Sequence, residues 1–227
     1  MTNATSRQIK RRAIVQWSLI PVVLLTIGLG WKYPLCGFSV PLVMLAGIIG
    51  GIFRGRYVCG NICPRGGFFD RILRWISRNR PIPNAIRNNT FRWTFFATMM
   101  GFMVYRVSMN PADIYHWGKV FWMMCVITTA IGVVFGILIH QRSWCAFCPM
   151  GTMQNALGGR KKHMRIDKDL CVECGSCEKA CPFNLAIIIH KDTGVIADPD
   201  CLKCSECIAA CPKNALSHPC KQMTNDQ

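Results

Sequence analysis

The chain alternates between long apolar runs and shorter segments rich in lysine and arginine. Three charge-free runs, residues 13–31, 35–53 and 120–139, are close to the roughly 20 residues that a helix needs to cross a bilayer. A shorter run, residues 93–105, is followed by Arg106, whose long side chain can extend toward lipid headgroups. The pattern predicts four transmembrane helices.

Basic residues collect in particular segments between these runs. The chain has 27 Lys and Arg residues against 11 Asp and Glu, and 24 of the 27 lie in residues 1–12, 54–92 and 141–227. Positively charged loops tend to stay in the cytoplasm. We therefore predict a multi-pass protein of the bacterial inner (cytoplasmic) membrane with both termini in the cytoplasm. Because topology accounts for the net charge of +16, no nucleic-acid partner is predicted.

Composition excludes two further classes of protein. The chain has fifteen cysteines and is 51% hydrophobic. A disordered chain lacks long apolar runs, and a small secreted disulfide scaffold lacks runs of membrane-spanning length. Residues 141–227 carry nine of the 11 acidic residues, and nine of the fifteen cysteines lie between Cys171 and Cys220. A membrane domain followed by a cysteine-rich, metal-binding domain is predicted.

The cysteine-rich segment contains an internal repeat. Residues 171–182 read CVECGSCEKACP and residues 201–212 read CLKCSECIAACP, each a C-x2-C-x2-C-x3-C-P run. Bacterial ferredoxins with two clusters have this spacing, and the fourth cysteine of each run binds the other cluster. Two 4Fe-4S clusters are predicted, the first held by Cys171, Cys174, Cys177 and Cys211 and the second by Cys201, Cys204, Cys207 and Cys181.

Zinc and disulfides are weaker interpretations of these cysteines. Zinc sites use pairs of Cys or His rather than two four-cysteine runs that end in proline, and disulfides are rare on the cytoplasmic side of a membrane. Each fourth cysteine is predicted to begin a helix. Residues 186–189 and 195–197 are predicted to form short strands around a turn at residues 192–194.

The membrane half contains a second repeat. Residues 56–66 read RYVCGNICPRG and residues 142–151 read RSWCAFCPMG. Aligning their second cysteines, at an offset of 85, also aligns two G-x3-G pairs in the preceding apolar runs, Gly47 with Gly51 and Gly132 with Gly136. Glycines at this spacing let two helices approach closely. A duplicated helical hairpin is predicted, in which the two G-x3-G helices pack together.

This packing would bring four thiols to the cytoplasmic edge of the membrane. One interpretation is a third metal or redox site made of Cys59, Cys63, Cys145 and Cys148. The alternative is that the short turns cap the helices and dock the tail with free thiols, since two such pairs are not a complete ligand run. The sequence leaves both interpretations open.

These features together carry a family resemblance. Four apolar runs, a Cys-Pro pair after the second and the fourth, and a two-cluster ferredoxin segment resemble the NapH/MauN type of ferredoxin-type quinol dehydrogenase membrane subunits. The resemblance extends from residue 13 to about residue 215. It implies electron transfer between the quinone pool, or a cytoplasmic reductant, and a partner redox protein. The chain differs in its short first periplasmic loop and in the two-residue spacing between Cys145 and Cys148.

Few residues are candidates for accepting protons from a quinol. Asp113, Tyr115 and His116 lie in the predicted periplasmic loop, and His140 ends the last apolar run. Structural roles at the membrane interface are the simpler interpretation for all four. The lone cysteines Cys36 and Cys125, predicted toward the outer face, are interpreted as small buried residues, and Cys220 has no assigned role.

We therefore expect an α-helical membrane protein with a C-terminal α+β ferredoxin-like domain. The predicted divisions are a basic arm, a membrane domain, a ferredoxin-like domain and a tail, over residues 1–12, 13–160, 161–220 and 221–227. The predicted function is electron transfer between quinol and a partner redox protein or iron–sulfur subunit. A rival is a redox or metal-reducing factor for the maturation or regulation of another metalloenzyme. Whether the chain is itself an enzyme is left open.

Overall fold

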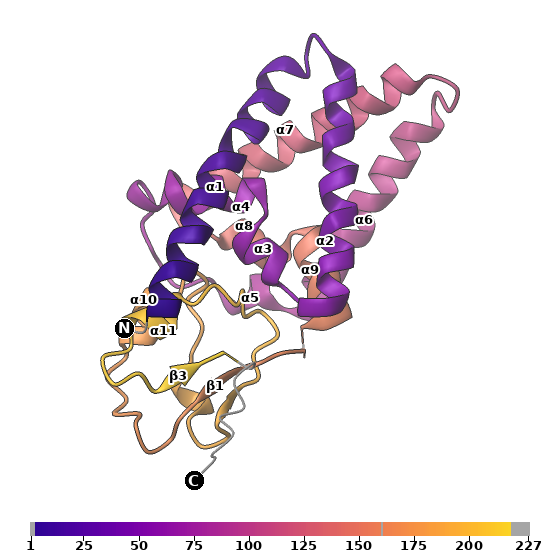
Figure 1. The fold of residues 1–227 in the computed structure, drawn as a ribbon. Coiled ribbons are helices and arrows are strands. Elements are labelled where there is room, and N and C mark those ends of the chain that lie inside the picture. Colours follow the sequence, from indigo (N-terminus) through magenta and orange to yellow (C-terminus); the bar gives the residue numbers. More distant parts are fainter. Residues whose placement is uncertain (1–2, 160, 219–227) are drawn as a thin grey trace.

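The structure, a computed structural model, describes residues 3–159 and 161–218 (Figure 1). It is mostly helical, with long helices at one end and a small domain with a three-stranded sheet at the other. Cys220 and the predicted tail over residues 221–227 lie outside the described residues.

Two helical hairpins form the larger part. The first consists of α1 (Asn3–Leu29) and α2 (Ser39–Arg54), joined by the 3-10 helix η1 (Pro34–Phe38). The second consists of α6 (Asn89–Ser108) and α7 (Ile114–Leu138). The tip of the first hairpin packs on the start of α7 at Gly37 and Gly118, where a Cβ on either glycine would overlap the other segment's backbone.

Three of these helices are long and apolar enough to cross a membrane, namely Thr5–Leu29, Pro34–Arg54 and Ile114–Leu138. They cover nearly all of the three long apolar runs of the sequence. The fourth prediction, over residues 93–105, is a helix within α6, but α6 is not among the membrane-spanning candidates of the described chain. Its apolar stretch between Arg92 and Arg106 is shorter than the roughly 20 residues that a span requires.

Short helices follow each hairpin at equivalent positions. The segment after α2 contains α3 (Tyr57–Asn61), α4 (Pro64–Arg71), η2 (Leu73–Trp75) and α5 (Asn84–Arg87), and the segment after α7 contains α8 (Ser143–Phe147) and α9 (Pro149–Gly158). Cys63 and Cys148 have similar extended backbones and directly precede α4 and α9. Proline suits the first position of a helix because that position needs no N–H donor. The two Cys-Pro pairs are therefore equivalent helix starts.

The glycines of α2 and α7 do not pack mainly against each other, so that prediction is wrong. Gly47 and Gly51 of α2 face Gln154 of α9, whereas Gly132 of α7 faces Phe69 of α4. Each helix thus packs on the short helix that follows the Cys pair of the other repeat. The short helices occupy the space beside the glycines because they fold back over the ends of the hairpins.

Replacing Gly132 with alanine tests this cross-packing. An added Cβ would lie 2.7 Å from Phe69 Cζ and 3.2 Å from Trp144 Cγ, both in side chains that are almost completely buried. Overpacking of this kind should lower the free energy of unfolding by about 1–3 kcal/mol. Gly101→Ala is the matched control, because nothing in the described part of the chain lies within 4 Å of its added Cβ. Thermal unfolding in detergent measures both, and equal stability of the two variants would contradict the packing.

The C-terminal domain contains a sheet in the order β2-β1-β3. Its elements are β1 (Met164–Ile166), α10 (Ser176–Ala180), η3 (Ile188–His190), β2 (Val195–Ile196), α11 (Glu206–Ala210) and β3 (Leu216–Ser217). Both pairings are antiparallel, with Met164 opposite Ile196 and Arg165 opposite Ser217. The core of the domain includes Phe183, Leu185 and Ile187, all nearly inaccessible to solvent.

Two local predictions for this domain are wrong. Residues 186–189 are not a strand, because residues 188–190 form η3 and β2 pairs instead with β1. The fourth cysteines do not begin helices either. Cys181 and Cys211 follow the ends of α10 and α11 as extended residues, so each short helix lies between the second and fourth cysteine of its run.

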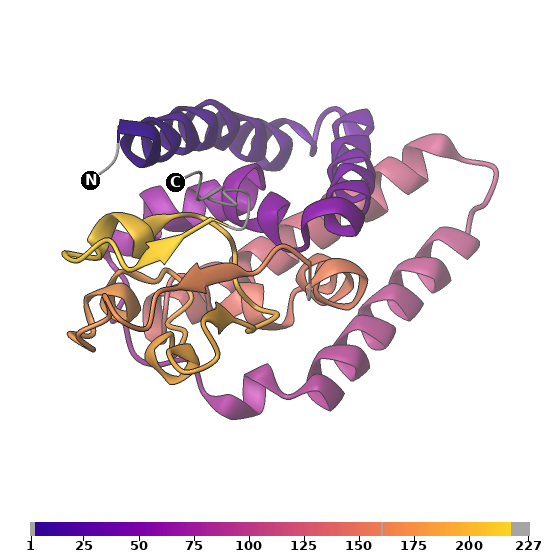
Figure 2. The same cartoon turned by 60° about the horizontal axis from the view of Figure 1, so that its bottom comes forward.

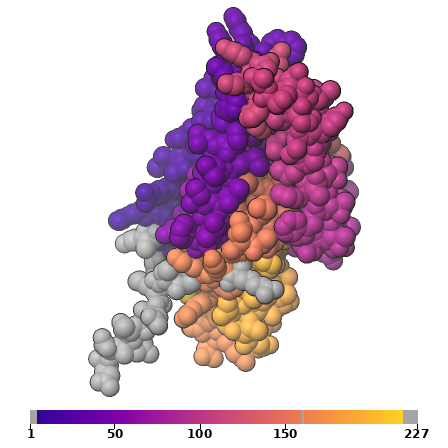
Figure 3. All heavy atoms as spheres, turned by 90° about the vertical axis from the view of Figure 1, so that its right-hand side faces the viewer, coloured from indigo at the N-terminus to yellow at the C-terminus, as the bar shows by residue number. Residues whose placement is uncertain are grey.

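The small domain covers one end of the helical hairpins (Figures 2 and 3). In Figure 3 its orange and yellow atoms lie below the indigo and pink helices. The N-terminal part of α1 contacts α11 directly. The Cys pairs of the membrane half therefore lie at the end that meets the ferredoxin-like domain.

Candidate functional site

The eight cysteines of the C-terminal runs surround two small cavities of about 20 Å³ each. The four predicted ligands of the first cluster line one cavity, and the four predicted ligands of the second line the other. The sets are Cys171, Cys174, Cys177 and Cys211, and Cys181, Cys201, Cys204 and Cys207. The fold therefore gathers the thiols in the sets that the repeat predicts, with the fourth cysteine of each run crossing to the other site.

The backbone around the two cavities repeats with the cysteines. Residues with positive φ occur at equivalent positions of the two runs, and the pairs are Glu173 with Lys203, Gly175 with Ser205, and Asn184 with Asn214. Positive φ is costly for residues other than glycine. Its recurrence at equivalent positions shows that both runs adopt the same loop, which places their thiols alike.

The two cavities differ in burial. In the first set Cys174 is exposed and Cys177 is buried, whereas in the second set Cys204 and Cys207 are buried and neither of the others is exposed. Burial raises the pKa of Cys201 to about 12 and that of Cys204 to about 11. Iron binds the thiolate form of cysteine, so the positive charge of the iron in a bound cluster would keep Cys201 and Cys204 deprotonated. The second set is thus the inner site and the first set the outer one.

A third and larger cavity lies where the two hairpins meet their short helices. Its volume is about 170 Å³, and its lining includes Cys59, Cys63, Cys145 and Cys148, from both repeats. Cys125 of α7 lines the same cavity, so it is not merely a residue near the outer end of the helix as predicted. The rest of the lining is mostly apolar, with methionines from α2, α6, α7 and α9.

The charged residues that line this cavity are Arg56, Arg65 and Arg142, and no carboxylate of the described residues joins them. Burial raises the pKa of Cys59 and Cys63, in the first case despite the nearby Arg56. Four thiols that are buried or partly buried, with cations beside them, suit a group that is held by thiolates and carries negative charge. Over residues 3–159 and 161–218, no three Cys, His, Asp or Glu side chains are placed to hold a single metal ion. The cysteines surround the cavity rather than converge on one point.

Arg56 and Arg142 connect the two repeats at the floor of the cavity. Each arginine precedes the first cysteine of its own pair by the same spacing, R-x2-C. Arg56 donates to the carbonyl oxygen of Cys145 at 2.5 Å, and Arg142 donates to the carbonyl oxygen of Cys59 at 3.1 Å. Gly66 and Gly151 leave room for the opposite guanidinium, which lies within 2.8 Å of a Cβ built at either position. Each arginine thus links its own repeat to the Cys pair of the other repeat.

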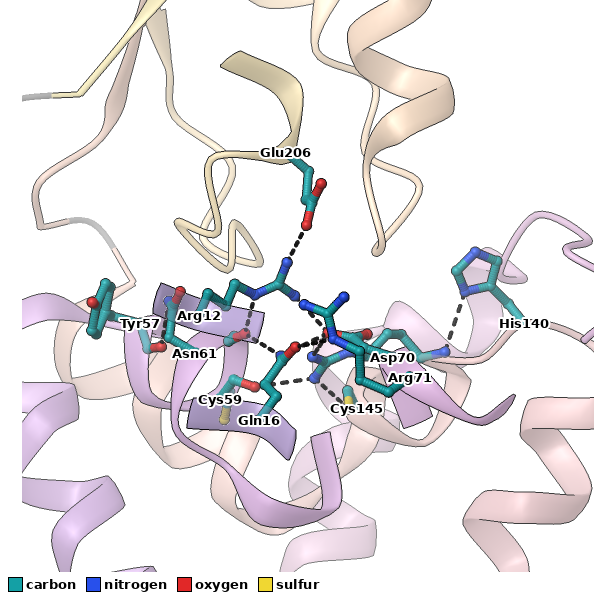
Figure 4. Close-up of polar contacts among 12 residues, drawn as sticks. Arg12, Gln16, Tyr57, Cys59, Asn61, Asp70, Arg71, His140, Cys145 and Glu206 are labelled. Carbon is teal, nitrogen blue, oxygen red and sulfur yellow. Dashed lines mark hydrogen bonds and ion pairs between the residues drawn. The ribbon is translucent and has the colours of Figure 1, made fainter. Parts of the chain in front are cut away.

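Asp70 neutralises Arg142 in a buried cluster (Figure 4). Its carboxylate accepts from Arg142 Nη2 at 2.5 Å, from Arg12 Nη2 at 2.5 Å and from Gln16 Nε2 at 3.1 Å. Burial alone would raise the pKa of Asp70, but Arg142 and Arg12 outweigh it and hold this pKa below its ordinary value. Arg12 also pairs with Glu206 of the C-terminal domain. The cluster therefore ties α1 to both α4 and the second cysteine run.

Asp200 neutralises Arg56 in an equivalent position. It accepts from Arg56 Nη1 at 2.6 Å and from Arg92 Nη1 at 2.8 Å, and Asn155 Nδ2 adds a bond at 2.9 Å. Burial would raise the pKa of Asp200, but Arg56 and Arg92 lower it. Asn155 matches Asp70 at the offset of 85. In the second repeat the acid is therefore supplied by the ferredoxin-like domain, from the residue next to Cys201.

The predicted proton acceptors have structural contacts. The Asp113 carboxylate accepts from Tyr115 N at 2.9 Å and caps α7, and His116 Nε2 lies 2.8 Å from the carbonyl oxygen of Arg106. His140 Nδ1 accepts from Arg142 N at 3.3 Å. None of these four described residues lines the large cavity.

His140 makes stability depend on pH. Burial, helped by Arg142, lowers its pKa to about 4. In the unfolded chain the imidazole takes up a proton below about pH 6.5. Above that pH it is neutral in both the folded and the unfolded chain, and stability is at its full value. As pH falls from about 6.5 to about 4, about 3 kcal/mol should be lost. Comparing the pH dependence of thermal unfolding with that of His140→Gln measures this loss, and parallel profiles would refute it.

The ion clusters contain residues that the sequence interpretation missed. Four of these residues count in the sequence only as positive charges that indicate topology, namely Arg12, Arg56, Arg92 and Arg142. The sequence assigns no role to Asp70 and Asp200. All six are buried. The R-x2-C spacing before each Cys pair could have indicated a role for Arg56 and Arg142, because it recurs in both repeats.

Comparison with protein families gives two matches. A family model described as a 4Fe-4S dicluster domain matches residues 163–212. A second, described as a 4Fe-4S binding domain, matches twice, at residues 36–83 and 120–167. Each of the latter segments contains one Cys pair of the membrane half. No curated protein and no solved structure was found to match.

These matches show an iron–sulfur protein of ferredoxin type. Its 4Fe-4S domains support a role in electron transfer, since such clusters exchange single electrons. The three long apolar helices suggest a membrane protein.

Proposed function

We propose that this iron–sulfur protein is an integral membrane electron-transfer subunit of the NapH/MauN type. It passes electrons between the quinol pool and a partner redox protein or iron–sulfur subunit. Its place is the bacterial inner membrane, with both termini and the ferredoxin-like domain in the cytoplasm. Both termini lie on the same side only if α6 crosses the membrane together with the three longer apolar helices, so the proposal includes α6 as a fourth span. The basic segments at the cytoplasmic ends of the four spans support this orientation.

One observation carries the proposal. Four cysteines from two segments far apart in the sequence line one cavity, and the second cysteine run of the ferredoxin-like domain packs directly behind it. A free-standing ferredoxin has no need of such a cavity beside three apolar helices. The arrangement suits a protein whose clusters exchange electrons with a donor or acceptor in the membrane.

We also propose a third iron–sulfur site in the cavity, supported by the four cysteines and the two arginines that line it. Cys59, Cys63, Cys145 and Cys148 would hold the group, and Arg56 and Arg142 would offset its negative charge. When bound, an iron–sulfur cluster supplies reversible one-electron chemistry. The chain's own contribution is to bury the thiols, to orient them through the crossed arginines and to exclude water with the apolar lining.

Quinol oxidation places a further demand on the protein. A quinol gives up two electrons and two protons, and the described residues that line the cavity include no carboxylate and no imidazole to accept the protons. The quinol headgroup is therefore assigned to a place outside this cavity, at the membrane surface of the helices. The clusters would take the two electrons one at a time.

Quinol reduction of the clusters tests the proposed function. Purified protein in lipid nanodiscs is mixed anaerobically with an excess of a short-chain quinol, and the clusters are followed by EPR. We expect reduction of the clusters by quinol. Clusters that stay oxidised with quinol but are reduced by a low-potential ferredoxin would contradict the quinol reaction.

The second outcome would favour the rival function, a redox or metal-reducing factor that serves another metalloenzyme. The methionine lining of the cavity supports this rival. Met99, Met100 and Met103 of α6 and Met124 of α7 lie around the same space as the cysteines. Thiol and thioether groups together favour soft metal ions.

A further inference from the structure

The two Cys pairs of the membrane edge differ in the residue that follows their first cysteine. Gly60 follows Cys59, whereas Ala146 follows Cys145. Both positions are buried within short helices, α3 and α8. Ala146 shows that this local fold accepts a side chain. Gly60 does not have a positive φ among the residues described, and glycine costs about 1 kcal/mol relative to alanine inside a helix. A reason other than backbone conformation is needed for Gly60.

The reason is a contact with the ferredoxin-like domain. A Cβ built on Gly60 would overlap the carbonyl oxygen of Leu202 and lie 2.8 Å from Leu202 Cβ. Leu202 follows Cys201, a ligand of the second predicted cluster, and is only 2% exposed. The backbone next to Cys59 therefore lies against the backbone next to Cys201, with no side chain from position 60 between them.

Charged contacts hold the second run in this position from both sides. Asp200 pairs with Arg56, and Lys203 Nζ donates to the carbonyl oxygen of Arg54 at 3.0 Å. Glu206 pairs with Arg12. These three residues lie at or next to the first half of the second run, and Arg56, Arg54 and Arg12 belong to the first helical hairpin or to the turn before α3. Asp200 is also held by Arg92 of α6.

The first run lies in more exposed surroundings. Val172, which matches Leu202 at the offset of 30, is 59% exposed, and Leu170, which matches Asp200, is 48% exposed. The two runs have the same loop, so their different burial comes from what they pack against. The second run faces the membrane edge and the first run faces away from it.

We infer that Gly60 is a positioning residue that brings the second predicted cluster against the membrane-edge cysteines. The contact between Gly60 and Leu202 is the junction between the ferredoxin-like domain and the cavity, and the first predicted cluster is the one that meets the redox partner. The role of the junction in electron transfer rests on the proposed function. One electron at a time would cross it, so that one of the two sites on either side of the junction is oxidised as the other is reduced, with no bond formed or broken and no proton moved.

Gly60→Ala tests the junction without relying on activity. Its methyl group must displace Leu202, so hydrogen exchange of the backbone amides over residues 200–206 should speed up about tenfold. Exchange over residues 170–177 should stay unchanged. Ala146→Gly is the matched control from the other repeat and should not speed exchange at residues 200–206. Exchange at wild-type rates in Gly60→Ala would overturn the inference.

A second variant keeps the test decisive if Gly60→Ala does not fold. Lys203→Met removes the bonds from Lys203 to the carbonyl oxygens of Arg54 and Lys161, and it should speed exchange over the same residues about fivefold. Unchanged exchange in that variant would also count against the junction.

EPR of the fully loaded protein separates this inference from the proposed function. Gly60→Ala with wild-type iron content should show a weaker magnetic interaction between the second tail cluster and the membrane-edge site. Faster exchange in a protein whose iron accounts for two clusters alone would leave the junction standing and remove the third site. A third cluster in a Gly60→Ala protein with wild-type exchange and wild-type magnetic interaction would support the third site and overturn the role of Gly60.

Discussion

Replacing Cys59 and Cys63 with serine is expected to remove about four of about twelve irons per chain, the content of one of three 4Fe-4S clusters. The two thiols line the large cavity together with Cys145 and Cys148. Serine is a poor ligand for iron, and two remaining thiols cannot hold a cubane. Iron quantification on purified protein, together with EPR spin counting, measures the loss.

The duplicated arrangement sharpens this experiment. Because each repeat supplies two of the four thiols, replacing Cys145 and Cys148 should remove the same amount of iron as replacing Cys59 and Cys63. Cys36→Ser is the control, since Cys36 lies in η1 at the hairpin tip and does not line the cavity. Unchanged iron in both double variants would show that the pairs are free thiols that cap the short helices.

Asp200→Asn is expected to lower the free energy of unfolding by about 3–5 kcal/mol, because it leaves buried arginines without their counter-charge. The Arg56 side chain is fully buried and that of Arg92 nearly so, and both guanidinium groups pair with the Asp200 carboxylate. An amide can accept hydrogen bonds but cannot neutralise two guanidinium groups. Asn155 nearby offers no charge to replace it.

Thermal or denaturant unfolding with wild-type iron content measures this effect. Asp169→Asn is the matched control, because Asp169 is exposed and a surface substitution should change stability by at most about 0.5 kcal/mol. The lowered pKa of Asp200 means that its stabilisation is present above the ordinary carboxyl pKa and is lost as pH falls through the lowered value. Equal stability of Asp200→Asn and Asp169→Asn would contradict the buried cluster.

Charge counting predicted topology but could not show which arginines are buried. Arg12, Arg56, Arg92 and Arg142 count toward the basic segments in the same way as exposed arginines do. Their burial depends on Asp70 and Asp200, one from each domain, and Asp200 meets its arginines only after the ferredoxin-like domain has docked. No local pattern distinguishes an arginine that will pair with such a distant carboxylate.

The glycines illustrate a similar limit. The G-x3-G spacing correctly marks positions where another segment approaches closely, because only the spacing along one helix is needed to read it. The partner segment was predicted wrongly. The short helices α9 and α4 fold back over the hairpin ends and pack against Gly47 and Gly132, respectively. The direction of these helices is set by the turns at the Cys-Pro pairs.

The sequence by itself determined the chemistry of the protein. Cysteine spacing is local and repeated, so it predicts the iron–sulfur domains and both sets of tail thiols without knowledge of the fold. Long charge-free runs likewise predict the three apolar helices, since length and composition are sufficient for that inference. The tertiary structure decided how these parts meet. The cavity, the crossed arginines and the contact of Gly60 with Leu202 join segments that lie far apart in the sequence. Such contacts depend on packing between domains, which no periodic pattern along the chain records.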